Sequence, residues 1–288
     1  MFLVTGATGD IGQRVVRILR QRETPVRSFV RLSSRYGELE HRGSEIFIGD
    51  LLEQRDIHKA CQGVRYIISA HGSGGDALAL DYRANIELID RALEVGVEHF
   101  VFMSVLGADR GYEDAPVFKA KREVEKYLQS SGLNYTILRP AGLASNLLPL
   151  AERFKQTGIY LLIGDFYNRT SIISTDDLAL MAVDSVSNAA ARNQILAAGG
   201  PEILKREDIP RIFSRIYQRE AFVLNPPLVV VDGLRTAIGL FNQDAQKAFG
   251  TFRTLLNNEF FCTPAEIEHL ESIFNLKLET LESFLRRN

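Results

Sequence analysis

Three glycines near the N-terminus stand at a spacing suited to binding a dinucleotide. The run Thr5-Gly6-Ala7-Thr8-Gly9-Asp10-Ile11-Gly12 follows a short apolar stretch, residues 1–4, and precedes a segment of helical spacing, residues 13–21. Glycine also suits an ordinary tight turn. Between a strand and a helix, however, glycines let backbone N–H groups approach a pyrophosphate at the positive end of the helix. The run therefore predicts a dinucleotide site formed by Gly6, Thr8, Gly9, Asp10, Ile11 and Gly12.

A second strand, residues 25–31, ends at Arg31, with Ser33 and Arg35 close behind. An acidic residue about 20 positions beyond the glycines holds the ribose 2′-hydroxyl of NAD, whereas an arginine accommodates the 2′-phosphate of NADP. Arg31 therefore favours NADP(H), with NAD(H) possible. The alternative is a solvated arginine at the end of a strand.

Strands and helices alternate along the first half of the chain. We expect further strands at 45–51, 64–70, 98–104 and 134–140, and helices at 52–61, 82–95 and 118–129. Such alternation requires parallel pairing with helices on both faces of the sheet. The sequence thus predicts an α/β fold, a Rossmann-type doubly wound parallel sheet over residues 1–142. Residues 143–288 should form a smaller α-rich substrate lobe, with some strands returning to the sheet.

Ligands of such sheets bind outside the carboxyl ends of the strands. This edge should carry Asp50 and Leu51, which could flank the adenine, and also Ala70, His71 and Ser104. The glycine-rich loop 71–75 either moves over the cofactor or is merely a mobile surface loop.

The second half should contain helices at 147–156, 178–185, 205–217 and 231–241 and strands at 158–163, 170–174 and 194–198. Thr175-Asp176-Asp177 is expected to cap the second of these helices, which explains both carboxylates without a catalytic role. Thr263-Pro264-Ala265-Glu266 is a capping box with proline at the first helical position.

The composition excludes several classes of protein. The net charge is −2 and both signs are interleaved, which argues against direct contact with nucleic acid. Two unrelated cysteines and five histidines without ligand spacing predict neither a disulfide framework nor a metal site. No apolar run reaches the roughly 18 residues of a membrane span, and no leader segment is expected. We expect a cytoplasmic protein, with a protein partner or a homodimer possible.

Several motifs together resemble a known family. They are the three glycines, Gly49-Asp50-Leu51, Ser104, Lys121 with Glu125 four positions later, Leu138-Arg139-Pro140, and Asp176-Asp177-Leu178-Ala179. Over about its first 205 residues the chain resembles the atypical short-chain dehydrogenase/reductases. It looks most like the NmrA-like NAD(P)H-binding branch. This branch includes isoflavone-reductase-like enzymes, quinone reductases, redox-sensing regulators and photosystem-assembly factors.

The resemblance implies catalytic roles for Ser104 and Lys121. In active members of the superfamily the serine orients the substrate, and the lysine holds the nicotinamide ribose and lowers the pKa of a tyrosine. That tyrosine stands four residues before the lysine, where this chain has Val117, or Ala115 if Lys119 is the family lysine. Neither side chain can transfer a proton.

Three interpretations remain open. The protein could reduce a substrate with Lys121 or water as the proton donor, or it could use another tyrosine, such as Tyr112 or Tyr82. It could instead bind the dinucleotide without turnover, as a sensor, regulator or assembly factor. We prefer an NADPH-dependent reductase of a small apolar or quinonoid substrate, held between the sheet edge and the C-terminal lobe. Nucleotide-sugar epimerases and dehydratases, which depend more strongly on the tyrosine, rank last.

Overall fold

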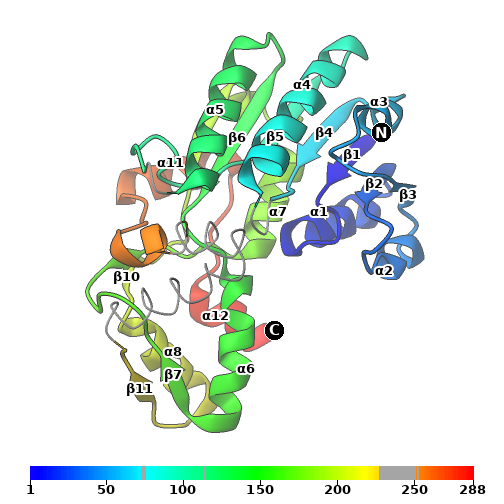
Figure 1. The fold of residues 1–288 in the computed structure, drawn as a ribbon. Helices are drawn as coiled ribbons and strands as arrows, with labels where there is room; N and C mark the ends of the chain where they lie inside the picture. The colour runs from blue at the N-terminus through cyan, green and yellow to red at the C-terminus, as the bar shows by residue number, and fades with distance from the viewer. Residues whose placement is uncertain (73–75, 113–114, 227–250, 252) are drawn as a thin grey trace, which may run out of the picture.

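The computed structural model describes residues 1–72, 76–112, 115–226, 251 and 253–288 (Figure 1). Within these residues a seven-stranded sheet has the order β3-β2-β1-β4-β5-β6-β9, and all its neighbouring strands pair in parallel. The order reverses between β1 and β4, as in the dinucleotide-binding folds. The predicted Rossmann-type sheet is therefore confirmed. Its strands are β1 (Phe2–Thr5), β2 (Val26–Val30), β3 (Glu45–Ile48), β4 (Tyr66–Ser69), β5 (His99–Met103), β6 (Tyr135–Pro140) and β9 (Gln194–Ala198).

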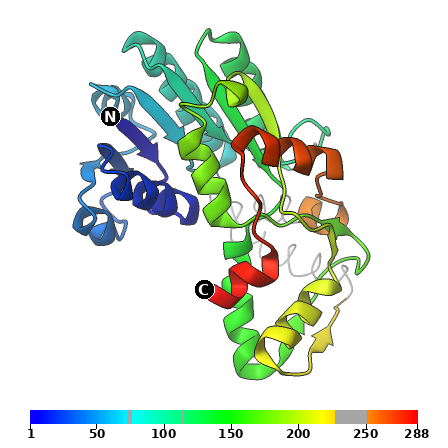
Figure 2. The same cartoon turned by 180° about the vertical axis from the view of Figure 1, so that it is seen from behind.

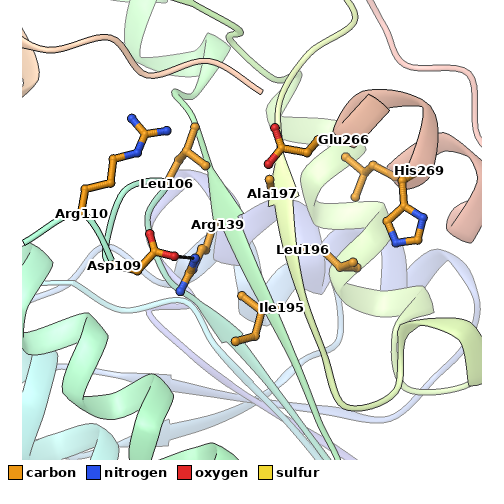
Figure 3. Close-up of a pocket in the computed structure, with 10 residues that line it drawn as sticks. Leu106, Asp109, Arg110, Arg139, Ile195, Leu196, Ala197, Glu266 and His269 are labelled. Atoms are coloured by element: carbon orange, nitrogen blue, oxygen red, sulfur yellow. Dashed lines mark hydrogen bonds and ion pairs between the residues drawn. The ribbon is translucent and has the colours of Figure 1, made fainter. Parts of the chain in front are cut away.

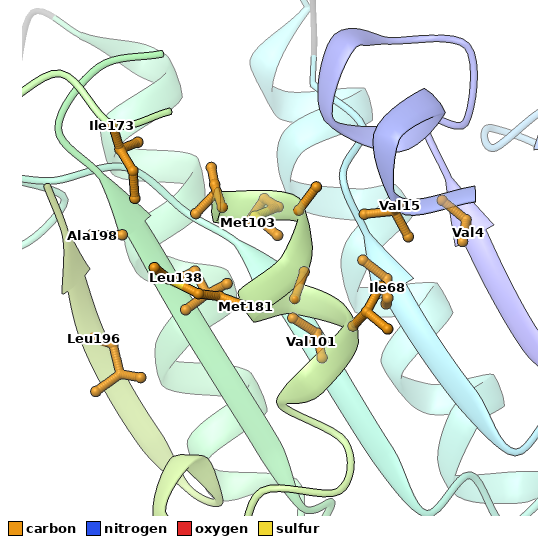
Figure 4. Packing of buried hydrophobic residues seen from close by; sticks show 14 of the residues in the cluster. Val4, Val15, Ile68, Val101, Met103, Leu138, Ile173, Met181, Leu196 and Ala198 are labelled. Carbon is orange, nitrogen blue, oxygen red and sulfur yellow. The ribbon is translucent and has the colours of Figure 1, made fainter. Parts of the chain in front are cut away.

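Helices cover both faces of the sheet. Successive side chains of a strand point to opposite faces, so the apolar residues of each strand enter two separate clusters. On one face Val4, Ile68 and Val101 pack against α1 (Asp10–Gln21) and α7 (Thr175–Asp184), as Figure 4 shows. On the other face Leu3 and Ile67 belong to a second cluster. That face is covered by α3 (Gln54–Cys61), α4 (Ala84–Glu94) and α5 (Pro116–Ser130). A π-helical segment, η1 (Ala77–Arg83), leads into α4, and a short helix, α2 (Gly37–His41), follows β2.

The second half of the chain builds a core of its own below the sheet (Figure 1). Phe154, Phe213 and Phe284 are its largest fully buried side chains. It is formed by η2 (Ala144–Leu147), α6 (Leu148–Thr157), β7 (Ile159–Leu161), α8 (Asp208–Tyr217) and α12 (Leu281–Arg287), and β11 (Phe222–Leu224) pairs with β7. Two short strands, β8 (Arg169–Thr170) and β10 (Leu204–Lys205), pair beside it. By contrast α7, β9, the turn η3 (Ala189–Ala191) and α11 (Pro264–Phe274) return to the sheet. The division at residue 142 stays a prediction.

The C-terminal helix α12 lies below the sheet domain, near the end of the chain marked C in Figure 2. Ion pairs around Asp176 fasten it to this domain. Its carboxylate accepts from Arg14 at 3.1 Å and from Arg287 of α12 at 2.5 Å, and also from Arg17. Asp177 accepts the backbone N–H of Glu279 at 2.8 Å. The two carboxylates therefore have structural partners at the start of α7.

Most element positions follow the sequence patterns, including the return of β9 and the capping box of α11. Some predictions are wrong. Helix α1 begins at Asp10, three residues early, because Gly9 is its N-cap, and α7 is capped by Ser174 rather than Thr175. The strand expected at 170–174 is reduced to β8, and α2 was not anticipated. The helix expected at 231–241 and loop residues 73–75 lie outside the described residues. No helix in the described ranges is long and apolar enough to cross a membrane. The cytoplasmic location stays a prediction.

Candidate functional site

Two of the three turn glycines are required by the packing of the protein itself. Gly6 has a φ of +67°, and a Cβ there would lie 2.6 Å from both the Ala70 oxygen and the His71 nitrogen. A Cβ at Gly12 would lie 2.2 Å from the Gly6 oxygen. These glycines therefore let α1 and the end of β4 approach the turn after β1.

Gly9 has a different role, because a Cβ there would meet little, with the Gly6 oxygen at 3.3 Å. It is exposed and caps α1, with no side chain bonded to the helix end. The first-turn N–H groups of a helix have no acceptor within the helix. No side chain caps them here, so the positive end of α1 fits a pyrophosphate.

The remaining residues predicted in this turn are Thr8, Asp10 and Ile11. The carbonyl of Thr8 accepts from the Gln13 side chain at 2.8 Å, and the Asp10 carboxylate lies 3.8 Å from the Arg14 guanidinium. The half-buried Ile11 packs against the core. The Thr8 carbonyl is thus bonded within the turn, the Asp10 side chain is exposed, and the Ile11 side chain is directed to the core.

The edge next to this turn carries Arg31, Asp50 and Leu51. Arg31 follows β2 directly and is exposed. The Asp50 carboxylate accepts the Leu52 N–H at 2.9 Å, and the buried Leu51 lines a cavity of about 410 Å³ together with Tyr82. The structure therefore brings Arg31, Asp50 and Leu51 to the predicted side of the sheet, beyond β1.

Lys121 belongs to α5, and its side chain reaches the end of β5 beside η1. Its ammonium group donates to the Met103 carbonyl at 2.7 Å, lies 3.6 Å from the Asp81 carboxylate, and stands 5.1 Å from the centre of the Phe102 ring. Burial lowers the pKa of Lys121. Asp81 was missed by sequence reasoning, because it belongs to η1, and no spacing rule marks a π-helical turn, although such turns are frequent at functional sites.

Ser104 is buried beside Lys121 but binds a different network. Its hydroxyl donates to Glu125 at 2.6 Å, and the fully buried Glu125 carboxylate also accepts from Arg139 at 2.8 and 2.6 Å. Arg139 in turn donates to Asp109 at 2.7 Å (Figure 3). Ser104 and Lys121 are thus close in the fold, and each has a partner within the protein. Their catalytic roles stay predictions.

The side chain of His71 joins the end of β1 to η1 by hydrogen bonds. Its Nδ1 accepts from the Thr5 hydroxyl at 2.8 Å, and its Nε2 is assigned as the donor to the Leu80 carbonyl at 3.0 Å. Burial lowers the pKa of His71 to about 4. The ring is therefore neutral and buried, while the half-buried Ala70 and the His71 backbone lie against Gly6.

An apolar cavity of about 600 Å³ begins where β6 ends. Ala141, Gly142 and Leu143 form its rim, while Leu147 and Tyr160 line it from the lower core and Phe260 from the C-terminal segment. Tyr112, one of the tyrosines considered above, packs on Phe260 with 5.8 Å between ring centres. A volume of this size suits a small-molecule ligand. A more polar cavity of about 510 Å³ lies beside β9, lined by Arg139, Glu266 and His269 among others (Figure 3).

Comparisons with known proteins also indicate NAD(P)H binding. A family model described as NAD(P)H-binding matches residues 6–189. An NAD(P)H azoreductase of Xenophilus azovorans is 30% identical over 217 residues, covering 74% of this chain and 73% of that protein. A photosystem II assembly factor, Ycf39 of Cyanophora paradoxa, is 27% identical over 300 residues, covering 99% of this chain and 90% of its own.

Solved structures share the fold over the whole chain. The triphenylmethane reductase of Citrobacter sp., complexed with NADP(H), has a TM-score of 0.81 at 17% identity, covering 100% of this chain and 99% of that one. The NADPH-dependent quinone oxidoreductase of Escherichia coli, complexed with NADPH, has a TM-score of 0.77 at 19% identity, with the same coverage. The resemblance to the NmrA-like NAD(P)H-binding branch is confirmed, and the chain belongs to the NAD(P)H-binding family.

Proposed function

We propose that this protein is an NADPH-dependent reductase of small apolar substrates, above all quinones. The observation that carries the proposal is the apolar cavity at the end of β6. It lies on the same sheet edge as the glycine turn after β1, with β4 and β5 between them. One edge thus offers a dinucleotide site and a separate apolar site, which a bisubstrate reductase requires.

The cofactor half of the proposal depends on Gly9 and Arg31. The uncapped N–H groups of α1 would hold the pyrophosphate, and Arg31 would pair with a 2′-phosphate at the end of the neighbouring strand β2. When bound, the nicotinamide supplies a hydride. Asp50 and Leu51 would flank the adenine.

The chemistry of the chain favours a substrate that needs no acid from the protein. The position of the superfamily tyrosine is Val117, and the Lys121 ammonium is directed to Met103 and Asp81. A quinone that accepts a hydride becomes a phenolate-type anion. The pKa of the corresponding hydroquinone is near that of tyrosine, about 10. Water can protonate such an anion, which gives the hydroquinone. An aldehyde would give a far more basic alkoxide, for which a positioned acid matters.

The roles of Ser104 and Lys121 follow from their contacts. Ser104 binds Glu125 and Lys121 binds the Met103 carbonyl, so both fix the end of β5 beside the sites. We infer that they position this strand end and the cofactor, and that water provides the proton.

The test is a survey of NADPH oxidation with 1,4-naphthoquinone, an enone and an aromatic aldehyde. We expect turnover with the quinone and little with the aldehyde. NADPH bound tightly, but oxidised by none of the three, would contradict the proposal.

A second function is favoured by the same contacts of Ser104 and Lys121. Both polar groups are engaged within the protein, and Ycf39, named as an assembly factor, aligns with 99% of this chain. The protein could then bind NADPH without turnover and act through a protein partner. This alternative predicts tight NADPH binding, no oxidation by any quinone, and a stable partner recovered in pull-downs.

A further inference from the structure

The apolar cavity at the end of β6 has a positive charge that no acidic residue of its described lining balances. Among the described residues that line it, the charged side chains are Arg153, Arg169 and Arg206, and none is acidic. The remaining lining is dominated by leucine and isoleucine side chains. An apolar wall with cations and no carboxylate is unusual, because a charge near apolar surface is costly unless a counter-charge is present.

Arg169 does not contribute to this imbalance. Its guanidinium forms a two-point ion pair with Glu259, with both N–O distances at 2.7 Å, and stacks on Phe261. Arg169 is therefore neutralised at the rim.

Arg206 is different, because all of its acceptors are backbone carbonyls. It donates to Ile163 at 3.2 Å, to Leu256 at 2.7 Å and to Leu255. These bonds fasten the segment 255–258 to the loop after β7, but a carbonyl offers a dipole and not a negative charge. No carboxylate in the described part of the chain forms an ion pair with Arg206. Burial lowers the pKa of Arg206, and the charge of the Asp165 carboxylate, which forms no ion pair with it, offsets this effect only in part.

Two further groups stand at the same cavity. Arg153 extends from α6, is exposed, and has no ion pair with any described carboxylate. Burial raises the pKa of Tyr160 to about 12, and the nearby charge of Arg206 opposes this effect only weakly. The Tyr160 hydroxyl therefore stays a neutral donor. The described lining thus offers two cations that form no ion pair with a described carboxylate, together with the Tyr160 hydroxyl. The wall around them is mainly apolar, with Asn146, Thr170 and Asn258 as its neutral polar members.

We propose that this cavity selects an apolar ring compound with one anionic group, a carboxylate or sulfonate, held by Arg206 and Arg153. Arginine suits this role because its charge persists and its planar donors match such groups. The terminal nitrogens of Arg206 already donate to backbone carbonyls, so Arg206 contributes mainly its charge, whereas the exposed Arg153 can also donate hydrogen bonds. The proposal rests on the proposed reductase function for the reaction, but its binding claim can be tested separately. If Arg206 served only to fasten segment 255–258, the cavity would not distinguish an anion from its neutral analogue.

The experiment compares the binding of 2-naphthoate and 2-naphthamide, which differ in charge but hardly in shape. Calorimetry uses protein saturated with NADP⁺, so that the basic residues beside the dinucleotide are already occupied. We expect the wild type to prefer the anion by roughly ten- to a hundredfold, the range of a hydrogen bond to a charged group. Arg206→Met should abolish most of this preference, and Arg153→Gln should reduce it, more strongly at low salt.

The matched control is Arg286→Gln on α12, whose guanidinium pairs with Glu282 outside the cavity. It should leave the preference unchanged. If Arg206→Met unfolds, Arg206→Lys and Arg153→Gln carry the test, and the lysine variant should keep a weaker preference. Equal binding of both ligands by the wild type, or an undiminished preference in both Arg153→Gln and Arg206→Met, would overturn the proposal.

Turnover separates this inference from the function on which it rests. NADPH oxidation is followed with 1,4-naphthoquinone and with its 2-sulfonate. If neither is reduced while naphthoate is still preferred, the reductase proposal fails and the anion site stands. If both are reduced equally and naphthoate has no advantage, the reductase stands and the anion site is wrong.

Discussion

The ammonium group of Lys121 lies 3.6 Å from the carboxylate of Asp81, inside the packing between α5 and η1. The Asp81 side chain is fully buried and that of Lys121 is 10% exposed. Removing one member of a buried ion pair leaves the other charge uncompensated, which usually destabilises a protein more than the pair stabilises it. This relationship makes Lys121 part of the fold as well as of the site.

Asp81→Asn should therefore lower the free energy of unfolding by about 3 kcal/mol. Lys121→Met should cost a comparable amount, whereas the double variant should recover part of the loss, because no charge is then left buried alone. Urea unfolding of the four proteins measures this coupling. Strictly additive losses would show that the two side chains do not interact.

Gly9→Ala and Gly12→Ala should separate cofactor binding from stability. A Cβ at Gly9 would lie 3.3 Å from the Gly6 oxygen, a tight contact that a small shift can relieve, so its variant should lose little stability and bind NADPH about tenfold more weakly. A Cβ at Gly12 would lie 2.2 Å from the Gly6 oxygen, so this variant should lose about 2 kcal/mol of stability or more.

Thermal unfolding and fluorescence titration with NADPH check both expectations. Unchanged NADPH affinity in a folded Gly9→Ala protein would argue against the pyrophosphate position.

Arg31→Gln should change the choice of cofactor rather than the fold. The side chain is exposed, so stability should not change, but NADPH should bind about tenfold more weakly while NADH binds as before. Arg55→Gln, an exposed arginine on α3, is the control. Equally weakened binding of NADPH and NADH would show that Arg31 does not bind the 2′-phosphate.

Two buried histidines should make the protein sensitive to mild acid. Burial lowers the pKa of His99 to about 4, below the usual 6.5, and the same holds for His71. The unfolded chain takes up these protons below about pH 6.5, whereas the folded protein resists them until about pH 4. Stability should therefore be complete above pH 6.5 and fall as the pH decreases toward 4, by about 3 kcal/mol for each histidine.

Urea unfolding at a series of pH values measures this loss. The matched variant is His99→Gln, whose amide can still donate to Thr136 but does not titrate in this range. Its stability should fall less steeply with decreasing pH than that of the wild type. Identical slopes would exclude His99 as a cause.

The sequence predicted the glycine turn and most of the strands, because these features depend on short-range patterns. Glycine spacing and alternating apolar residues are visible within about ten positions, and even the return of β9 followed from its apolar character. The helix caps were less accurate. Ser174 and Thr175 both suit an N-cap, and only the backbone conformation decides between them.

The partners of the site residues could not be predicted, since they come from distant segments. Ser104 donates to Glu125, which also accepts from Arg139, and Arg206 donates to the carbonyls of segment 255–258. No local spacing specifies which atom a buried serine or arginine will bind. The apolar cavity likewise combines several separated segments, so the sequence indicated its location but not its lining.

The most direct test of the central claim is a single-turnover reaction of the NADPH complex with 1,4-naphthoquinone. Leu147 lines the cavity and is half-buried, so Leu147→Trp should fill part of it, whereas Leu93→Trp on the exposed side of α4 is the control. We predict rapid oxidation of bound NADPH in the wild type and control, and at least tenfold slower oxidation in Leu147→Trp with unchanged NADPH affinity. Tightly bound NADPH that no quinone oxidises in the wild type would contradict the account.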